Sequence, residues 1–149
     1  MTTNTTTDFT VDLAIAAPVE RVRDAVARVE DWWSTAVDRD GDELTAHFDS
    51  NWTRARVDGD RWTITAQDTP ALPVADEWVG DVITFAVEDT GAGTSILRFT
   101  HHGLLAQECA SDCTPAWQNF LASLVQLAET GQGNPWRPGM AAAGERAGA

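Results

Sequence analysis

Hydrophobic residues near the start of the chain first alternate with polar ones and then change to a helical spacing. The run FTVDLAI at 9–15 is apolar at every second position, which predicts a strand. Pro18 suits the first turn of a helix, because proline lacks an N–H that would be unpaired there. Apolar side chains at helical spacing follow. We therefore expect a helix over about 18–30, with 31–34 either extending it or opening a short second helix.

Period-two alternation returns after residue 42 and covers the middle of the chain. It predicts strands at 44–48, 52–57 and 62–66, with the Asp58-Gly59 pair as a hairpin turn between the last two. The proline-containing segment 68–76 is expected to be a loop. A further strand is marked by Val79, Ile83, Phe85 and Val87. After a turn at Gly91-Ala92-Gly93, a last strand is expected through Leu97, Phe99 and His101.

The final regular element is a long amphipathic helix. It is expected to start near Thr114-Pro115, a hydroxyl cap followed by proline, and to end at Gly131. Its apolar stripe must be buried, and the concave face of a curved antiparallel sheet is the available partner. The fold class is therefore α+β. The sequence beyond 135 is rich in Gly, Ala and Pro, so we expect one domain over 1–135 and a C-terminal tail over 136–149.

Composition excludes several partners for this chain of 149 residues. Its formal net charge is −13, and its ten basic residues are all arginine. An acidic surface argues against nucleic acid and against an anionic membrane. The N-terminus lacks the pattern of a secretory signal, and no run reaches the roughly 18–20 apolar residues of a membrane span. A cytoplasmic protein is expected.

The run FTHHGLLAQECASDC at 99–113 gathers residue types that could bind a metal or act as a thiol nucleophile. His101 and His102 are neighbours in a strand and point to opposite faces, and Cys109 and Cys113 lack a second pair. We therefore predict no metal. Cys113 precedes a helix, which favours a thiolate, and His101 is the one plausible base. The alternative is a pair of inert buried cysteines.

His101 shares a strand face with Leu97 and Phe99, so it should look toward the long helix. It is either a satisfied core histidine or the polar group of an apolar pocket, where it would orient a ligand oxygen or act as an acid–base group. We expect Trp33 in the core and Trp32 nearer the pocket mouth or the surface. The predicted ligand-binding residues are Trp32, Trp62, Phe85, Phe99, His101, Trp117, Phe120 and Leu124.

An ordered series of short motifs resembles the START-like superfamily, also called SRPBCC or helix-grip. The motifs are APVERV at 17–22, DWWS at 31–34, EWVG at 77–80, LRFTH at 97–101 and ETGQGNP at 129–135. Within the superfamily the chain is most similar to the branch named after the activator of the heat-shock-protein-90 ATPase (AHSA-like). The resemblance implies a helix-grip fold with a hydrophobic cavity between the sheet and the long helix. The superfamily includes lipid carriers, hormone receptors, cyclases and chaperone regulators, so it does not imply one function.

Three functions follow as hypotheses. The leading one is binding of a small, mostly apolar ligand, without a cofactor, in the cavity between the sheet and the C-terminal helix. The second is an enzyme of cyclase or hydrolase type, with His101 as its acid–base group. The third is an interaction module that regulates a chaperone or another protein. A homodimer and a protein partner both stay open as assemblies.

Overall fold

The structure, a computed structural model, describes residues 7–139. Within them one antiparallel sheet has the strand order β1-β7-β6-β5-β4-β3-β2. The strands are β1 (Phe9–Ile15), β2 (Val37–Asp40), β3 (Glu43–Phe48), β4 (Asn51–Asp58), β5 (Arg61–Asp68), β6 (Val82–Gly91) and β7 (Thr94–His101). The helices are α1 (Val19–Ala27), α2 (Ala110–Thr130) and the 3-10 turns η1 (Val29–Asp31) and η2 (Leu104–Ala106).

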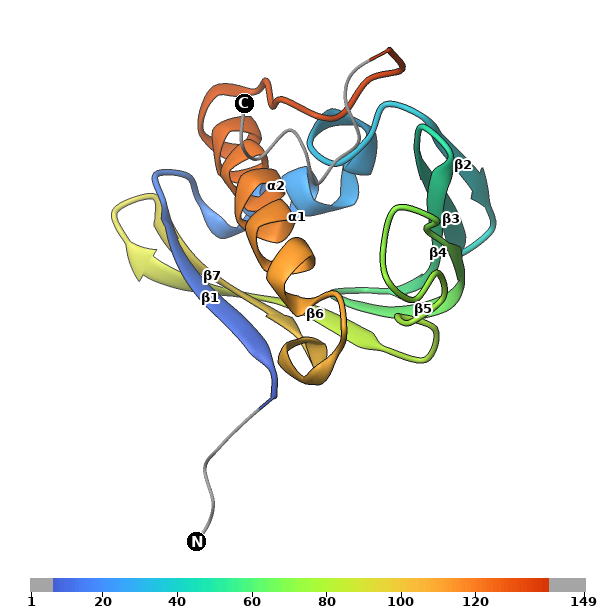
Figure 1. Cartoon of the computed structure of the whole chain (residues 1–149). Helices are drawn as coiled ribbons and strands as arrows, with labels where there is room; N and C mark the ends of the chain where they lie inside the picture. Colours follow the sequence, from blue (N-terminus) through green and yellow to red (C-terminus); the bar gives the residue numbers. More distant parts are fainter. Residues whose placement is uncertain (1–6, 140–149) are drawn as a thin grey trace, which may run out of the picture.

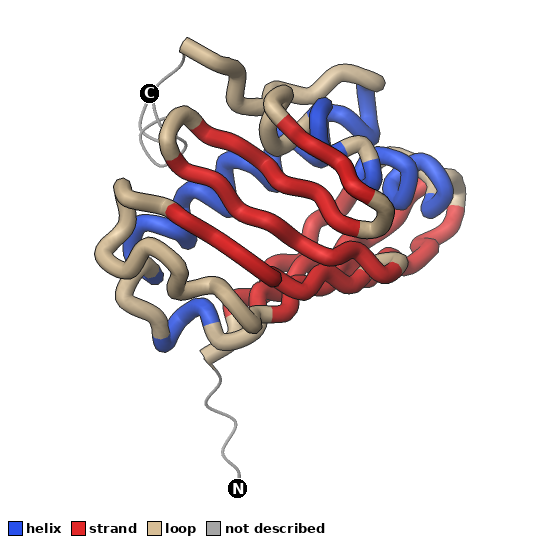
Figure 2. Tube along the Cα trace, turned by 90° about the vertical axis from the view of Figure 1, so that its right-hand side faces the viewer, coloured by secondary structure: helices blue, strands red, loops and turns tan. Residues whose placement is uncertain are grey.

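Both α-helices lie against the concave face of the sheet. α1 packs on β6, β7 and α2, and α2 packs on β1. Figure 1 shows α2 running across the sheet, with β2 to β5 curving up beside it, and Figure 2 shows the strands as one bent layer. This confirms the α+β helix-grip fold. In the described part of the chain, no helix has both the length and the hydrophobicity to cross a bilayer.

The strands follow the hydrophobic alternation closely, except that β2 was not predicted and that the expected start of β6 is wrong. The first strand has the predicted bounds, and the hairpin turn after β4 has Gly59 at φ 62°. Val79 was expected in a strand, but β6 begins only at Val82, and Val79 is 47% exposed. The reason is a pair of tight turns, in which Val79 N–H donates to the carbonyl of Asp76 and Asp81 N–H to that of Trp78.

α2 begins five residues before Pro115, the first helical position that the cap-and-proline pattern predicts. It starts at Ala110, and Pro115 lies inside it. The carboxylate of Glu77, in the loop before β6, accepts hydrogen bonds from the backbone N–H groups of the two residues just before the helix and so fixes the segment that leads into it. The predicted end is confirmed: Gly131 follows the helix at φ 86°, a left-handed conformation that glycine adopts without strain.

The expected position of Trp32 near the pocket mouth or surface is wrong, because the ring is completely buried. α1 ends at Ala27 and a 3-10 turn follows, so the helical register does not continue to residue 32. The indole N–H of Trp32 donates to the carbonyl of Val26 at 3.2 Å, and its ring stacks on Trp62. Trp33 is buried, as predicted.

The packed structure continues past residue 135. Trp136, which falls in the predicted tail, is 3% exposed and packs edge-on against Phe48. Its N–H donates to the carbonyl of Trp33 at 3.0 Å. Gly133 permits this course, because a Cβ there would clash with the backbone carbonyl of Asp31. The rest of the predicted tail, from 140 onward, lies outside the described residues.

Candidate functional site

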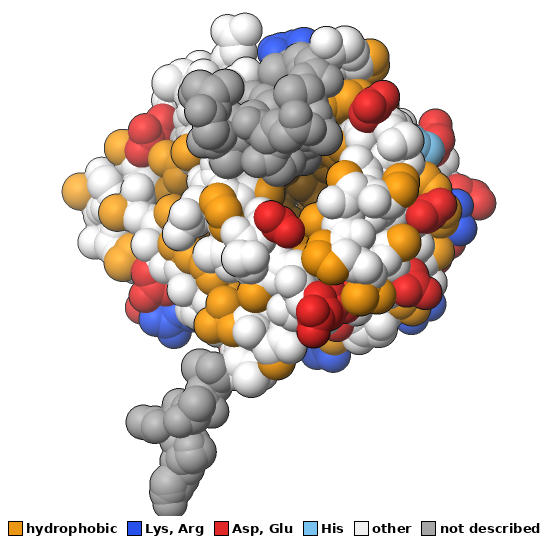
Figure 3. Space-filling model, in the orientation of Figure 1, with side chains coloured by type: hydrophobic (Ala, Val, Ile, Leu, Met, Phe, Trp, Pro, Cys, Tyr) orange, Lys and Arg blue, Asp and Glu red, His pale blue; other side chains and the backbone are white. Residues whose placement is uncertain are grey.

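A pocket of about 340 Å³ lies between the N-terminal half of α2, the ends of β4 and β5, and the loop 69–81. We call it the aromatic pocket, because five aromatic side chains line it. They are Trp33, Phe48, Trp78, Trp117 and Phe120. Figure 3 shows a hollow bordered by hydrophobic side chains near the middle of this face.

Three of these side chains form a stack. The ring of Trp117 is nearly parallel to that of Trp33, with centroids 5.6 Å apart and planes at 16°. On its other side it is nearly parallel to Trp78, at 5.7 Å and 7°. Indole rings lose few rotamers on burial and offer large apolar faces. The stack therefore gives the pocket a preorganised wall.

The polar side of the pocket results from a β-bulge. The pairing of β4 with β5 shifts between Arg54 and Ala55, where Thr65 becomes the extra residue. Because side chains alternate in a strand, an extra residue exchanges the two faces. Ile64 and Gln67 consequently both point inward, although the predicted alternation would have kept Gln67 outside.

Gln67 uses its amide to fix the neighbouring segments. Its Oε1 accepts the backbone N–H of Trp78 at 2.9 Å, and its Nε2 donates to the Thr53 hydroxyl at 3.2 Å. Asn51 and Thr69 act similarly, since Asn51 Oδ1 accepts from the N–H of Ala71 and the Thr69 hydroxyl donates to a carbonyl of the loop. These bonds hold the loop 69–81 as one wall of the pocket.

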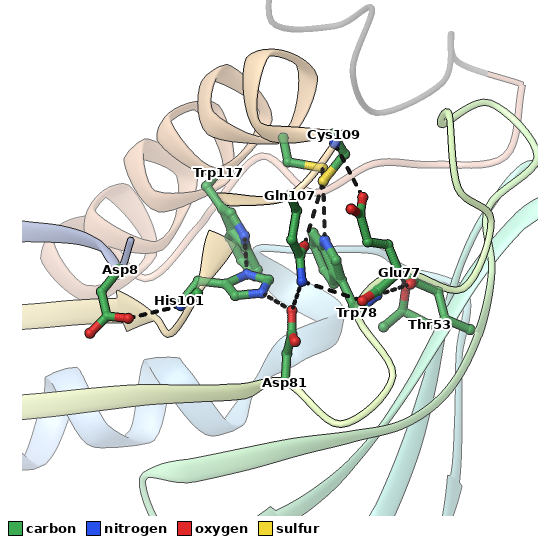
Figure 4. A network of polar contacts seen from close by, with 12 residues as sticks. Asp8, Thr53, Glu77, Trp78, Asp81, His101, Gln107, Cys109 and Trp117 are labelled. Atoms are coloured by element: carbon green, nitrogen blue, oxygen red, sulfur yellow. Dashed lines mark hydrogen bonds and ion pairs between the residues drawn. The ribbon is translucent and has the colours of Figure 1, made fainter. Parts of the chain in front are cut away.

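His101 lies behind that wall, in the polar network of Figure 4. Its ring is fully buried. Nδ1 accepts the indole N–H of Trp117 at 3.1 Å, so the proton is on Nε2, which donates to Asp81 Oδ2 at 2.8 Å. Asp81 also accepts from the Gln107 amide at 2.7 Å. Burial lowers the pKa of His101, while hydrogen bonding to Asp81 opposes that shift. This is the geometry of a satisfied core histidine.

Cys109 and Cys113 are free, buried thiols at the start of α2, with their sulfurs 2.6 Å apart. The hydrogen bond from Cys113, helped by one from the Trp78 indole, lowers the pKa of Cys109. The same contact and burial raise the pKa of Cys113 far above its usual value. His101 has both ring nitrogens engaged elsewhere, so the thiols lack the base that was considered for them. Within residues 7–139, no group of three or more His, Cys, Asp or Glu side chains is arranged to hold a metal.

The structure does not bring the predicted ligand-binding residues together around one cavity. Trp117 and Phe120 line the aromatic pocket. Trp62 and Phe85 line a second recess of about 500 Å³ between α1 and the sheet. The other four line neither space and are fully buried in the core between them: Trp32, Phe99, His101 and Leu124. Close packing, such as the 4.6 Å between the ring centroids of Phe99 and Trp117, fills the expected centre of the cavity.

The aromatic pocket is the better candidate site, although the second recess has the larger volume. The second recess opens at the exposed turn Gly59-Asp60, and its Arg39 is held by Glu30 at 2.7 Å. Five aromatic side chains and inward polar groups are more typical of a ligand site. Sequence reasoning missed Thr53 and Gln67 because a bulge has no strict sequence signal. Trp78, in the EWVG motif, was noticed but not assigned to a face.

Comparisons with known proteins show which solved structures share this fold. No family model and no curated protein matches the chain. Among solved structures, the Aha1 dimer from Colwellia psychrerythraea is 22% identical over 85% of this chain and 98% of its own, with a TM-score of 0.66. DynU16, a protein of the dynemicin biosynthetic locus, is 19% identical over 85% and 48%, with a TM-score of 0.54. CalU16 from Micromonospora echinospora is 17% identical over 83% and 66%, also at 0.54. The chain therefore shares the helix-grip fold of these structures.

Proposed function

We propose that the protein binds a small, mostly apolar ligand in the aromatic pocket. The observation that carries the proposal is a space of about 340 Å³ walled by five aromatic side chains. Ligand pockets typically measure roughly 300–1,000 Å³ and combine apolar walls with a few polar groups. The volume lies at the lower end of that range, so the ligand is small.

Thr53 and Gln67 are the polar groups that would orient the ligand. The Thr53 hydroxyl accepts a hydrogen bond from Gln67 and still carries a hydrogen of its own, and the Gln67 amide has a second N–H. Both side chains line the pocket. A ligand with one oxygen on an apolar body suits this pair of donors.

Binding is favoured over catalysis by the position of His101. The ring lies outside the pocket lining, and its two nitrogens bond Trp117 and Asp81. A general acid or base must reach the proton that it transfers. The enzyme hypothesis therefore lacks the group that was nominated for it.

The test is a fluorescence titration with 1-octanol, because three tryptophans line the aromatic pocket. Ala116 lies in the pocket lining on α2, and Ala122 is exposed on the same helix. We expect a saturable change in the wild type and in Ala122→Phe, and its loss in Ala116→Phe, because the added ring fills the space. Equal responses in the two variants would contradict the proposal. If a panel of neutral alcohols gives no saturable response, the interaction-module hypothesis takes its place.

Dimerisation is a separate proposal, supported by the dimeric state of the Aha1 structure. Exposed apolar side chains at Val74, Val79 and Leu105 offer surface for a contact between copies. Light scattering on a sizing column should then give twice the chain mass of 16.1 kDa. A measured mass of one chain at high protein concentration would reject dimerisation.

A further inference from the structure

The charge of the aromatic pocket is one-sided. Among the described residues that line it, Asp112 carries the single charge, and no arginine takes part. The whole sequence contains no lysine. Figure 3 shows acidic side chains beside the hollow. A carboxylate ligand would enter without a counterion and would meet Asp112, which is exposed where the pocket opens.

The N-terminus of α2 does not provide the missing positive charge. A helix N-terminus normally attracts anions through its free N–H groups. Here the carboxylate of Glu77 already lies beside that end of the helix, accepting the N–H of Glu108 at 2.7 Å and that of Cys109 at 3.2 Å. A second anion at this end of the helix would be repelled by Glu77.

The first turn of α2 offers acceptors for a cation. Pro115 has no N–H, so the carbonyl of Ser111 lacks the donor that an α-helix would normally give it, and both residues line the pocket. That carbonyl and the Asp112 carboxylate are acceptors suited to an N–H⁺ donor.

We propose that the aromatic pocket selects organic cations of the alkylammonium class over carboxylates of the same size. The proposal rests on the proposed function, since it assigns a ligand class to the same pocket. The apolar chain packs among the indole rings, and the ammonium lies at the opening near Asp112. The net charge of −13 adds long-range attraction for cations.

The experiment compares octylammonium, 1-octanol and octanoate, which share chain length and differ in charge. Their dissociation constants are measured at neutral pH and low salt. We expect octylammonium to bind at least about tenfold more tightly than octanoate, with octanol between them. Asp112→Asn should weaken octylammonium about two- to fivefold and leave octanol unchanged. The control Glu108→Gln removes a nearby exposed charge outside the lining. It should change neither dissociation constant by as much as Asp112→Asn changes that of octylammonium.

The outcomes separate this inference from the proposed function. If octanoate binds as tightly as octylammonium, and Ala116→Phe abolishes both, the pocket binds ligands but the cation selectivity is wrong. Octylammonium binding that survives Ala116→Phe would place the cation on the acidic surface and overturn the inference. Failure of all three ligands to bind would reject the proposed function itself.

Discussion

The two flanks of α2 differ in how completely the sheet and the helix close on each other. Toward β1 and β7 the interior is solid, and Leu97, Phe99 and Leu124 have no exposed surface. Toward β4 and β5 a pocket remains, and the buried Thr53 and Gln67 face it. The same helix and the same sheet therefore form a core on one side and a candidate binding site on the other.

The difference shows how polar side chains keep a space open. A buried amide must be hydrogen-bonded, since mutational data show that leaving it unpaired costs about 1–3 kcal/mol. Gln67, turned inward by the bulge, meets this need by bonding Thr53 and the Trp78 backbone rather than by packing on α2. Apolar side chains on the other flank have no such requirement and pack on the helix directly.

The largest expected effect compares phenylalanines on the two flanks. Phe99→Ala should reduce the free energy of unfolding by roughly 3–5 kcal/mol, because the ring is surrounded by packed neighbours such as Phe85 and Trp117. Phe120→Ala should cost less, because that ring already borders a pocket and leaves fewer contacts behind. Urea denaturation of both variants measures the two values. If the two variants lose the same unfolding free energy, or if Phe120→Ala loses more, the distinction between a solid and a hollow flank is wrong.

The next effect tests the wall of the pocket. Gln67→Met keeps the side-chain length but leaves the Trp78 N–H unpaired, so we expect a loss of about 1–3 kcal/mol in unfolding free energy and weaker octanol binding. Gln118→Met, at an exposed position of α2, is the control and should lie within about 0.5 kcal/mol of wild type. If Gln67→Met keeps full stability and binding, the amide does not support the pocket.

The third effect is the pH dependence of the unfolding free energy, which should depend on His101, a residue between the two flanks. Burial lowers its pKa in the folded protein, so the unfolded chain, with a pKa near 6.5, takes up a proton first as the pH falls. The contribution of neutral His101 to the unfolding free energy is complete above about pH 6.5. It is lost below that pH, with a slope of at most about 1.4 kcal/mol per pH unit. His101→Gln should flatten the decline in unfolding free energy between pH 7 and 5.

The control for this effect is His102→Gln, because the His102 ring is exposed in the turn that follows β7. It should retain the wild-type decline between pH 7 and 5. A decline that persists in His101→Gln would mean that other groups cause it, and the satisfied, neutral state of His101 would then have no measurable consequence for stability.

The smallest effect concerns the acidic surface around both flanks. With a net charge of −13, repulsion among exposed carboxylates should weaken as salt screens it. Raising NaCl from about 0.05 to 1 M should increase the unfolding free energy by on the order of 1 kcal/mol. A flat response in both NaCl and KCl would show that the carboxylates are already balanced by pairs such as Arg98 with Asp12.

The solid flank was more predictable from the sequence than the hollow one. Leu97, Phe99 and His101 alternate without interruption, so their shared inward face followed directly from period two. Gln67 reaches the interior through a bulge, and Trp32 reaches it because a 3-10 turn follows α1. Both are local departures from regular strand or helix geometry, which a periodic pattern does not contain.

Long-range partners explain the remaining differences. The start of α2 at Ala110 depends on Glu77, more than thirty residues earlier, and the burial of Trp136 depends on the backbone of Trp33. The ETGQGNP motif was noticed as a family-like run. Its physical role emerges from Gly133, whose missing side chain lets the segment cross Asp31 closely.

The most direct measurement of ligand binding in the aromatic pocket is a nitrogen–proton correlation spectrum of the seven indole N–H groups during an octanol titration. Single Trp→Phe substitutions assign the signals. The account predicts that the signals of Trp33, Trp78 and Trp117 move together and saturate, while those of Trp32 and Trp62 stay in place. Movement of Trp62 without Trp78 and Trp117, or no movement of any signal at saturating octanol, would contradict it.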